Sequence, residues 1–154
     1  MNNYSQYFSY LNNMSKTTNI PNMNDQNKIN QTSQVANKSY AEPYEAFVRG
    51  NLFNGLYDQY KNYKPIELNP SNEREYALLL VQVYKFCAHE LNLYLDNYPN
   101  DRDAIKSRND YLKAYKEALN QYESKYGPLS VTSNTTSGNP WAWDTTTWPW
   151  EGNY

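Results

Sequence analysis

Apolar residues recur at helical spacing in two long stretches of the chain, residues 73–96 and 101–126. In the first stretch, alternate steps of four and three residues line one helix face with Leu80, Tyr84, Cys87, Leu91 and Tyr94. In the second stretch, steps of three and four predict a packed seam with one polar break, formed by Ile105, Arg108, Leu112, Tyr115, Leu119, Tyr122 and Tyr126 and widened on one side by Ala104, Tyr111 and Ala118. The pattern predicts two long amphipathic helices.

Short polar segments mark the ends of these helices. Asn72 is placed to cap the first helix with Glu75 as its reciprocal partner, and Pro99 ends that helix because proline has no N–H to donate. Asn100 or Asp101 can cap the second helix, which ends at the pair Gly127 and Pro128. Because the connection is short, the helices should be antiparallel neighbours. The predicted fold class is therefore all-α, an antiparallel helical hairpin.

The first helix carries more apolar residues than one neighbour can cover. Besides its main stripe it presents Leu78, Leu79, Val81, Val83, Phe86, Leu93 and Leu95. A helix that is apolar around most of its circumference is buried on several sides. We therefore expect a second hairpin, the C-terminal tail or another protein to cover this second face.

The segments before the hairpin differ in character. Residues 1–40 are rich in Asn, Gln, Ser and Thr and are predicted to be disordered. Residues 41–64 form an amphipathic piece that Gly50 and Gly55 limit to one or two short turns, so it must dock on something. Its apolar residues are Phe47, Leu52, Phe53, Leu56, Tyr57 and Tyr60. A linker, residues 65–72, leads to the hairpin domain, residues 73–129.

The C-terminal tail, residues 130–154, concentrates the tryptophans of the chain. They are Trp141, Trp143, Trp148 and Trp150. Pro140 and Pro149 predict an extended, non-helical segment. Exposed indoles are unfavourable, so the tail either folds back over the hairpin or forms a partner-binding surface.

Composition and charge exclude several functional classes. The net charge is -2 and the charges are interspersed, which disfavours nucleic-acid binding. One cysteine excludes an internal disulfide framework. The N-terminus has no basic flank or apolar core of a signal peptide, and no apolar run could span a membrane. We expect a soluble protein made in the cytosol.

The chain offers few residues for catalysis or metal binding. A di-metal carboxylate bundle needs Glu-x-x-His on a helix, but Phe86 stands three residues before His89, the only histidine. Cys87 and His89 point to different helix faces, and Cys87 on the apolar stripe should be a buried, inert thiol. We expect no cofactor, no metal and no enzymatic activity.

Two stretches resemble known families. The chain has the residues of a CotJA-like pattern at Pro43, Glu45, Ala46, Gly50, Leu52, Phe53, Leu56, Tyr57 and Tyr60. The runs ELNLYLDNYPNDRDAI, YESKYGPL and NPWAWDTTTWPWE occur in the order found in CotJB spore coat proteins, over nearly all of residues 74–151. The chain thus resembles a CotJA-like piece fused in front of a CotJB-like domain.

The resemblance implies a function. It predicts a non-catalytic structural protein of the bacterial endospore coat, made in the mother-cell cytoplasm without a signal peptide, which assembles with other coat proteins. The implied main partner resembles a manganese catalase. Assembly of the chain into a homo-oligomer is a second possibility. The expected partner-binding residues are Trp141, Trp143, Trp148, Trp150, Phe47, Leu52, Phe53, Leu56 and Tyr57. The CotJA-like piece could pack on its own hairpin or on another molecule. The alternative function is a carbohydrate-binding module whose tryptophans stack on spore glycan.

Overall fold

A computed structural model describes residues 39–145 of the chain, and the expectation of disorder for residues 1–40 lies almost wholly outside that range. Its helical elements are α2 (Pro43–Arg49), η1 (Asn54–Leu56), α3 (Glu73–Asn97), α4 (Arg102–Tyr126), η2 (Asn134–Thr136) and α5 (Ala142–Thr145). Extended pairing within residues 39–145 is limited to an isolated antiparallel bridge between Tyr40 and Phe53. The predicted all-α class is confirmed for this part of the chain.

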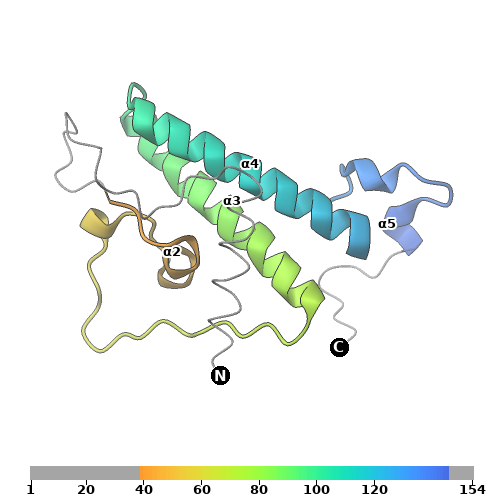
Figure 1. The fold of residues 1–154 in the computed structure, drawn as a ribbon, viewed down its shortest axis with the longest axis horizontal. Helices are drawn as coiled ribbons and strands as arrows, with labels where there is room; N and C mark the ends of the chain where they lie inside the picture. Colours follow the sequence, from red (N-terminus) through yellow and green to blue (C-terminus); the bar gives the residue numbers. More distant parts are fainter. Residues whose placement is uncertain (1–38, 146–154) are drawn as a thin grey trace.

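The predicted antiparallel hairpin is confirmed by α3 and α4, which pack against each other along their length (Figure 1). The Asn72 side chain accepts a hydrogen bond from the Glu75 N–H at 2.9 Å, while the Glu75 carboxylate accepts one from the Ser71 N–H at 2.6 Å. At the bend, Asp101 caps α4 by accepting from the Ala104 N–H at 3.1 Å. The Asn72 and Asp101 side chains replace helical partners that the first N–H groups of α3 and α4 lack, while Glu75 binds the Ser71 N–H just before the cap.

The two helices contribute unequally to their interface. All five residues of the predicted α3 stripe are buried. The predicted α4 seam is wrong at Ile105, which is 38% exposed, and Arg108, Leu112, Tyr115 and Leu119 are only partly buried. The buried α4 residues are Ala104, Tyr111, Ala114, Ala118, Tyr122 and Glu123. The helix is thus turned toward its alanines, because small side chains let two helix backbones approach closely while larger ones flank the contact.

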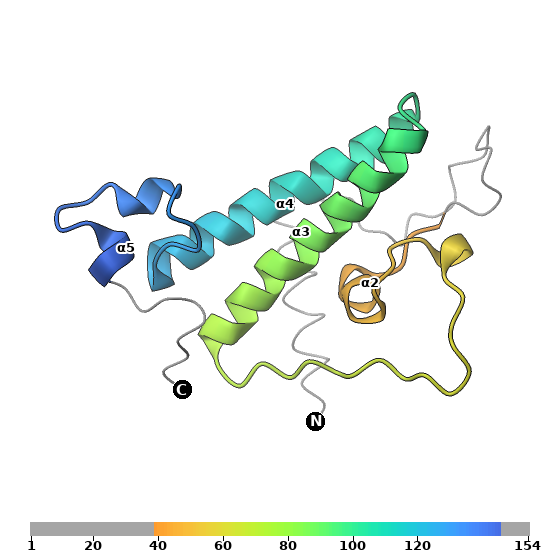
Figure 2. The ribbon, with the colours of Figure 1, turned by 180° about the vertical axis from the view of Figure 1, so that it is seen from behind.

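The second apolar face of α3 is covered by the chain itself except at Leu93, which is 49% exposed. Helix α2 packs against α3, and Figures 1 and 2 show it beside the middle of that helix, across from α4. The side chains of Leu52, Val83, Cys87 and Leu91 are among the most deeply buried of the protein. The core therefore forms around α3, with α4 packed on one side of this helix and α2 on another.

The tail differs from the extended segment that its prolines predict. Residues 134–136 form the turn η2, and α5 begins at Ala142, after Pro140. A proline before the first residue of a helix removes none of its hydrogen bonds, so Pro140 does not prevent this single turn. Pro149, Trp148 and Trp150 lie outside the described residues.

Buried tyrosines make the fold sensitive to alkaline pH. Burial and the hydrogen bond to Asp101 raise the pKa of Tyr94 to about 12, and burial raises the pKa values of Tyr40 and Tyr111 as well. A raised tyrosine pKa means that folding favours the neutral phenol. Its contribution to stability is complete below the unfolded pKa of about 10 and is lost as pH rises toward 12.

We therefore expect the melting temperature to stay level up to about pH 9 and to fall steeply above pH 10. The measurement is a thermal melt followed by circular dichroism at each pH. The Tyr94→Phe variant, which cannot ionise at this position, should lose less stability over the same interval. An equally steep decline in that variant would contradict the role of Tyr94.

Candidate partner-binding surface

Residues 39–56 fold into a small closed unit, here named the clip. The Ala41 N–H donates to the Leu52 carbonyl at 2.9 Å, and the Asn54 N–H donates to the Ser39 carbonyl at 3.0 Å. Helix α2 lies between these paired ends and finishes at Gly50, whose φ of 77° is a left-handed conformation that glycine adopts easily. The two ends of the clip are thus held together by backbone hydrogen bonds.

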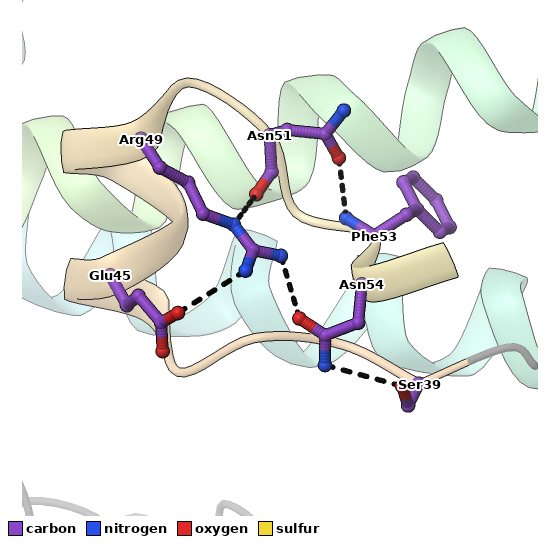
Figure 3. A network of polar contacts seen from close by, with 6 residues as sticks. All are labelled: Ser39, Glu45, Arg49, Asn51, Phe53 and Asn54. Carbon is purple, nitrogen blue, oxygen red and sulfur yellow. Dashed lines mark hydrogen bonds and ion pairs between the residues drawn. The ribbon is translucent and has the colours of Figure 1, made fainter. Parts of the chain in front are cut away.

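Arg49 holds the interior of the clip together (Figure 3). Its side chain is almost fully buried and donates to the Asn51 carbonyl at 2.8 Å, to Glu45 Oε1 at 3.2 Å and to Asn54 Oδ1 at 2.7 Å. The guanidinium also lies over the Tyr57 ring, 4.6 Å from its centroid. A charge removed from water needs such partners, and here the clip and the residue that follows it supply them.

The clip docks on the hairpin through aromatic contacts. The Phe47 and Phe86 rings meet edge to face with centroids 5.7 Å apart, and the Phe53 ring stacks on Tyr94 at 5.0 Å. Leu52 is fully buried, and its N–H donates to Glu90 Oε2 at 3.3 Å. Three of the expected partner-binding residues, Phe47, Leu52 and Phe53, therefore make contacts within their own chain in this conformation.

From Leu56, the last residue of the clip, the chain exposes apolar side chains on residues 56–68, here named the strap. Tyr60 is 84% exposed and Ile66 is 80% exposed, and Leu56, Tyr63 and Leu68 are also exposed. Figures 1 and 2 show the strap as an open loop that runs from η1 back to the start of α3. Of the expected partner-binding residues, Leu56 belongs to this exposed set, and Tyr57 is partly buried beside Arg49.

Most strap residues were missed by the sequence analysis, which treated residues 65–72 only as a linker. A signal was present: Tyr63, Ile66 and Leu68 are apolar residues in a stretch without helical periodicity. Apolar side chains that belong to no helix face have no obvious place in a helical core. They were therefore candidates for an exposed binding segment.

Glu123 fixes the beginning of the tail on the last turn of α4. Its buried carboxylate accepts hydrogen bonds from the Leu129 N–H at 3.0 Å and from the Ser133 hydroxyl at 2.6 Å. Farther along, Trp141 is 52% exposed and Trp143 in α5 is partly buried. The tail thus leaves the hairpin in a defined direction with an indole accessible to solvent.

The described residues offer little support for metal or nucleophilic chemistry. Between residues 39 and 145, no group of three or more His, Cys, Asp or Glu side chains could hold a metal ion. Cys87 is fully buried, and burial raises the pKa of its thiol above the ordinary value, which favours the unreactive protonated form. His89 is exposed on the far side of α3 from the core.

Comparison with known protein families gives a match over the hairpin and the tail. A protein-family model described as CotJB protein matches residues 75–151, half of the chain. This chain belongs to the CotJB family. CotJB is a spore coat family whose members are generally structural. Comparisons with curated proteins and with solved structures gave no match.

The CotJB match includes α3, α4 and the tail, and it begins after the clip and the strap. The resemblance of the clip to CotJA stays a prediction. CotJB membership places the protein in the spore coat. Among the helices of residues 39–145, none combines the length and the apolar character needed to cross a membrane.

Proposed function

We propose that this CotJB chain is a non-catalytic assembly protein of the bacterial endospore coat and that its main partner is a manganese-catalase-like coat protein. One observation supports the proposal: the protein has a packed helical core, yet its loops expose large apolar side chains. The clip covers most of the second apolar face of α3, where Leu93 remains 49% exposed. The strap and the tail, in contrast, present Tyr60, Ile66 and Trp141 to solvent.

Contiguous exposed apolar segments of this kind are typical of protein-binding surfaces. Tyrosine and tryptophan supply much of the energy of protein interfaces, because they bury a large area and lose little conformational freedom. Trp143, Trp148 and Trp150 extend the same composition along the tail. Leu56 and Tyr57 lie where the clip passes into the strap and belong to the same proposed surface.

The aliphatic part of the strap favours a protein partner over a glycan. Sugar rings are bound by flat aromatic side chains, as Trp141 could do, but Ile66, Leu56 and Leu68 have no flat ring to stack on a sugar. These branched side chains instead suit the pockets of another protein. Glycan binding by the tail is therefore the alternative function, and the Trp141→Ala variant distinguishes it from binding to a coat protein.

We expect the double variant Tyr60→Ala/Ile66→Ala to bind the manganese-catalase-like protein from the same spores at least ~10-fold more weakly, because loss of a hot-spot side chain costs about 2 kcal/mol or more. Trp141→Ala should have a similar effect. Affinity is measured with the full chain by light scattering after size exclusion, and circular dichroism should stay unchanged because all three side chains are exposed.

Val131→Ala is the matched control, since Val131 is exposed but lies outside the strap and precedes the tail's tryptophans. Unaltered binding by both the strap and the Trp141 variants would refute the proposed surface. Loss of binding to peptidoglycan fragments on Trp141→Ala, with coat-protein binding retained, would favour the carbohydrate-binding alternative.

A further inference from the structure

The clip is built to keep its shape when it leaves its hairpin. Its ends are joined by their own backbone hydrogen bonds, and the partners of Arg49 come from the clip and the adjoining Tyr57. The hydrogen bond from Asn54 Nδ2 to the Ser39 hydroxyl at 3.2 Å is internal as well. Separation from α3 would free the Leu52 N–H from Glu90 to water, and it would leave the hydrogen bonds within the clip intact.

The contacts between clip and hairpin are mainly apolar. Phe47 meets Phe86, Phe53 stacks on Tyr94, and the buried Leu52 donates its N–H to Glu90. Every copy of the chain carries the same docking site on α3. A clip from a second copy can therefore make the same contacts as the clip of the chain itself.

The strap and the residues up to Asn72 form a connection long enough for such an exchange. Residues 57–72 can reach roughly 50 Å when fully extended, at about 3.3 Å a residue. Packed helices lie only about 8–10 Å apart, so a neighbouring hairpin is within reach. Two hydrogen bonds join the Tyr44 hydroxyl to the backbone of Leu68, and both must break before the connection can extend to this length.

We propose that the clip of one copy docks on the hairpin of a second copy, so that two chains exchange their clips. The exposed strap supports a second copy as the occupant. In an exchanged dimer the two straps lie between the hairpins, where Tyr60, Tyr63 and Ile66 of both chains can pack on each other. The exchanged form therefore uses the strap part of the proposed coat surface and leaves the tail with Trp141 for the coat partner. The exchange goes beyond the proposed coat function, because the partner in it is the chain itself.

Concentration decides which form is populated. A flexible connection of this length keeps the clip at an effective concentration of the order of mM at its own hairpin. Dilute chains are therefore closed monomers. Exchange becomes favourable when chains are packed at comparable concentrations, and burial of the straps lowers that threshold.

The test uses two full-length variants that each carry one cysteine in a Cys87→Ala background, Phe47→Cys in one and Phe86→Cys in the other. The chains are mixed at about 1 mM, partly unfolded and refolded, and joined with a short bismaleimide. A chain with one cysteine cannot link to itself, so a heterodimer requires docking between copies. We expect at least ~10-fold more heterodimer than with the control pair Phe47→Cys and Lys85→Cys, because exposed Lys85 points away from the clip.

Equal heterodimer yields from the two pairs would overturn the proposal.

A second variant favours the exchanged form by shortening the connection. Phe53 lies on Tyr94, roughly 30 Å along α3 from Glu73 at 1.5 Å a residue. With residues 58–67 deleted, the seven steps from Leu56 to Glu73 reach roughly 23 Å and the η1 turn adds roughly 6 Å, so the clip could reach its own site only with the connection fully stretched. The deletion variant should be a dimer by light scattering and should become a monomer when Leu52→Asp is added. A monomeric deletion variant, or a dimer that survives Leu52→Asp, would count against exchange. Neither experiment contains the coat partner, so failure here leaves the proposed coat function standing.

Discussion

Replacement of Tyr122 by alanine should lower the free energy of unfolding by about 3–5 kcal/mol, the range for removal of a buried aromatic side chain. Tyr122 is 1% exposed and lies against Tyr126, with ring centroids 5.2 Å apart. Its hydroxyl accepts a hydrogen bond from Arg74 Nε at 3.1 Å, which joins the first turn of α3 to the last turns of α4. The side chain therefore closes the open end of the hairpin. Urea denaturation followed by circular dichroism measures the loss.

Tyr122→Phe is the matched control for this prediction. It keeps the ring and removes only the hydroxyl, so it should cost about 0.5–1.5 kcal/mol, the net contribution of one hydrogen bond. A loss below about 1 kcal/mol for the alanine variant would mean that the open end of the hairpin is not packed in solution as the structure has it.

Leu52→Ala should have the second-largest effect, a loss of about 2–5 kcal/mol for a fully buried leucine. Leu52 occupies the centre of the contact between clip and α3, beside the hydrogen bond of its own N–H to Glu90. Its truncation leaves a cavity that the aromatic pairs on either side cannot fill. We expect the clip to detach before the hairpin unfolds, so limited proteolysis should cut residues 39–56 in the variant under conditions that spare the native chain.

Leu56→Ala provides the comparison only four residues away. Leu56 is 56% exposed, so its truncation should change stability by no more than about 0.5 kcal/mol. Similar proteolysis of the Leu52 and Leu56 variants would show that the clip is not held by the buried side chain.

The hairpin could be predicted because its signals are local. The caps at Asn72 and Asp101 and the proline at the bend each act within a few residues, and the α3 stripe spans whole turns of one helix. The rotation of α4 was predicted only in part. Ala104, Tyr111 and Ala118 were placed beside the seam and are buried, whereas Ala114 was missed because a small side chain contributes little to hydrophobic periodicity.

The candidate surface was harder to predict because exposure is a property of the whole fold. Phe53 and Leu56 are similar residues three positions apart, yet one stacks on Tyr94 and the other faces solvent. Only the pairing of residues 39–41 with 52–54 decides which of them turns inward, and that pairing forms across α2. Sequence reasoning identified the segment as one that must dock, and left open where it docks.

The position of the four tryptophans allows the tail to be followed by intrinsic fluorescence. All four tryptophans lie in residues 141–150, whereas the packed hairpin contains tyrosines and a single phenylalanine, Phe86. Tryptophan emission excited at the red edge of the absorption band therefore comes from the tail alone. Tyrosine emission comes almost wholly from the rest of the chain, because Tyr154 is the one tyrosine of the 17 that lies in the tail. Without any added label, a shift in the tryptophan signal reports an event at the tail, and a change in the tyrosine signal reports mainly an event elsewhere. The order in which the two parts respond to a partner can therefore be followed in one cuvette.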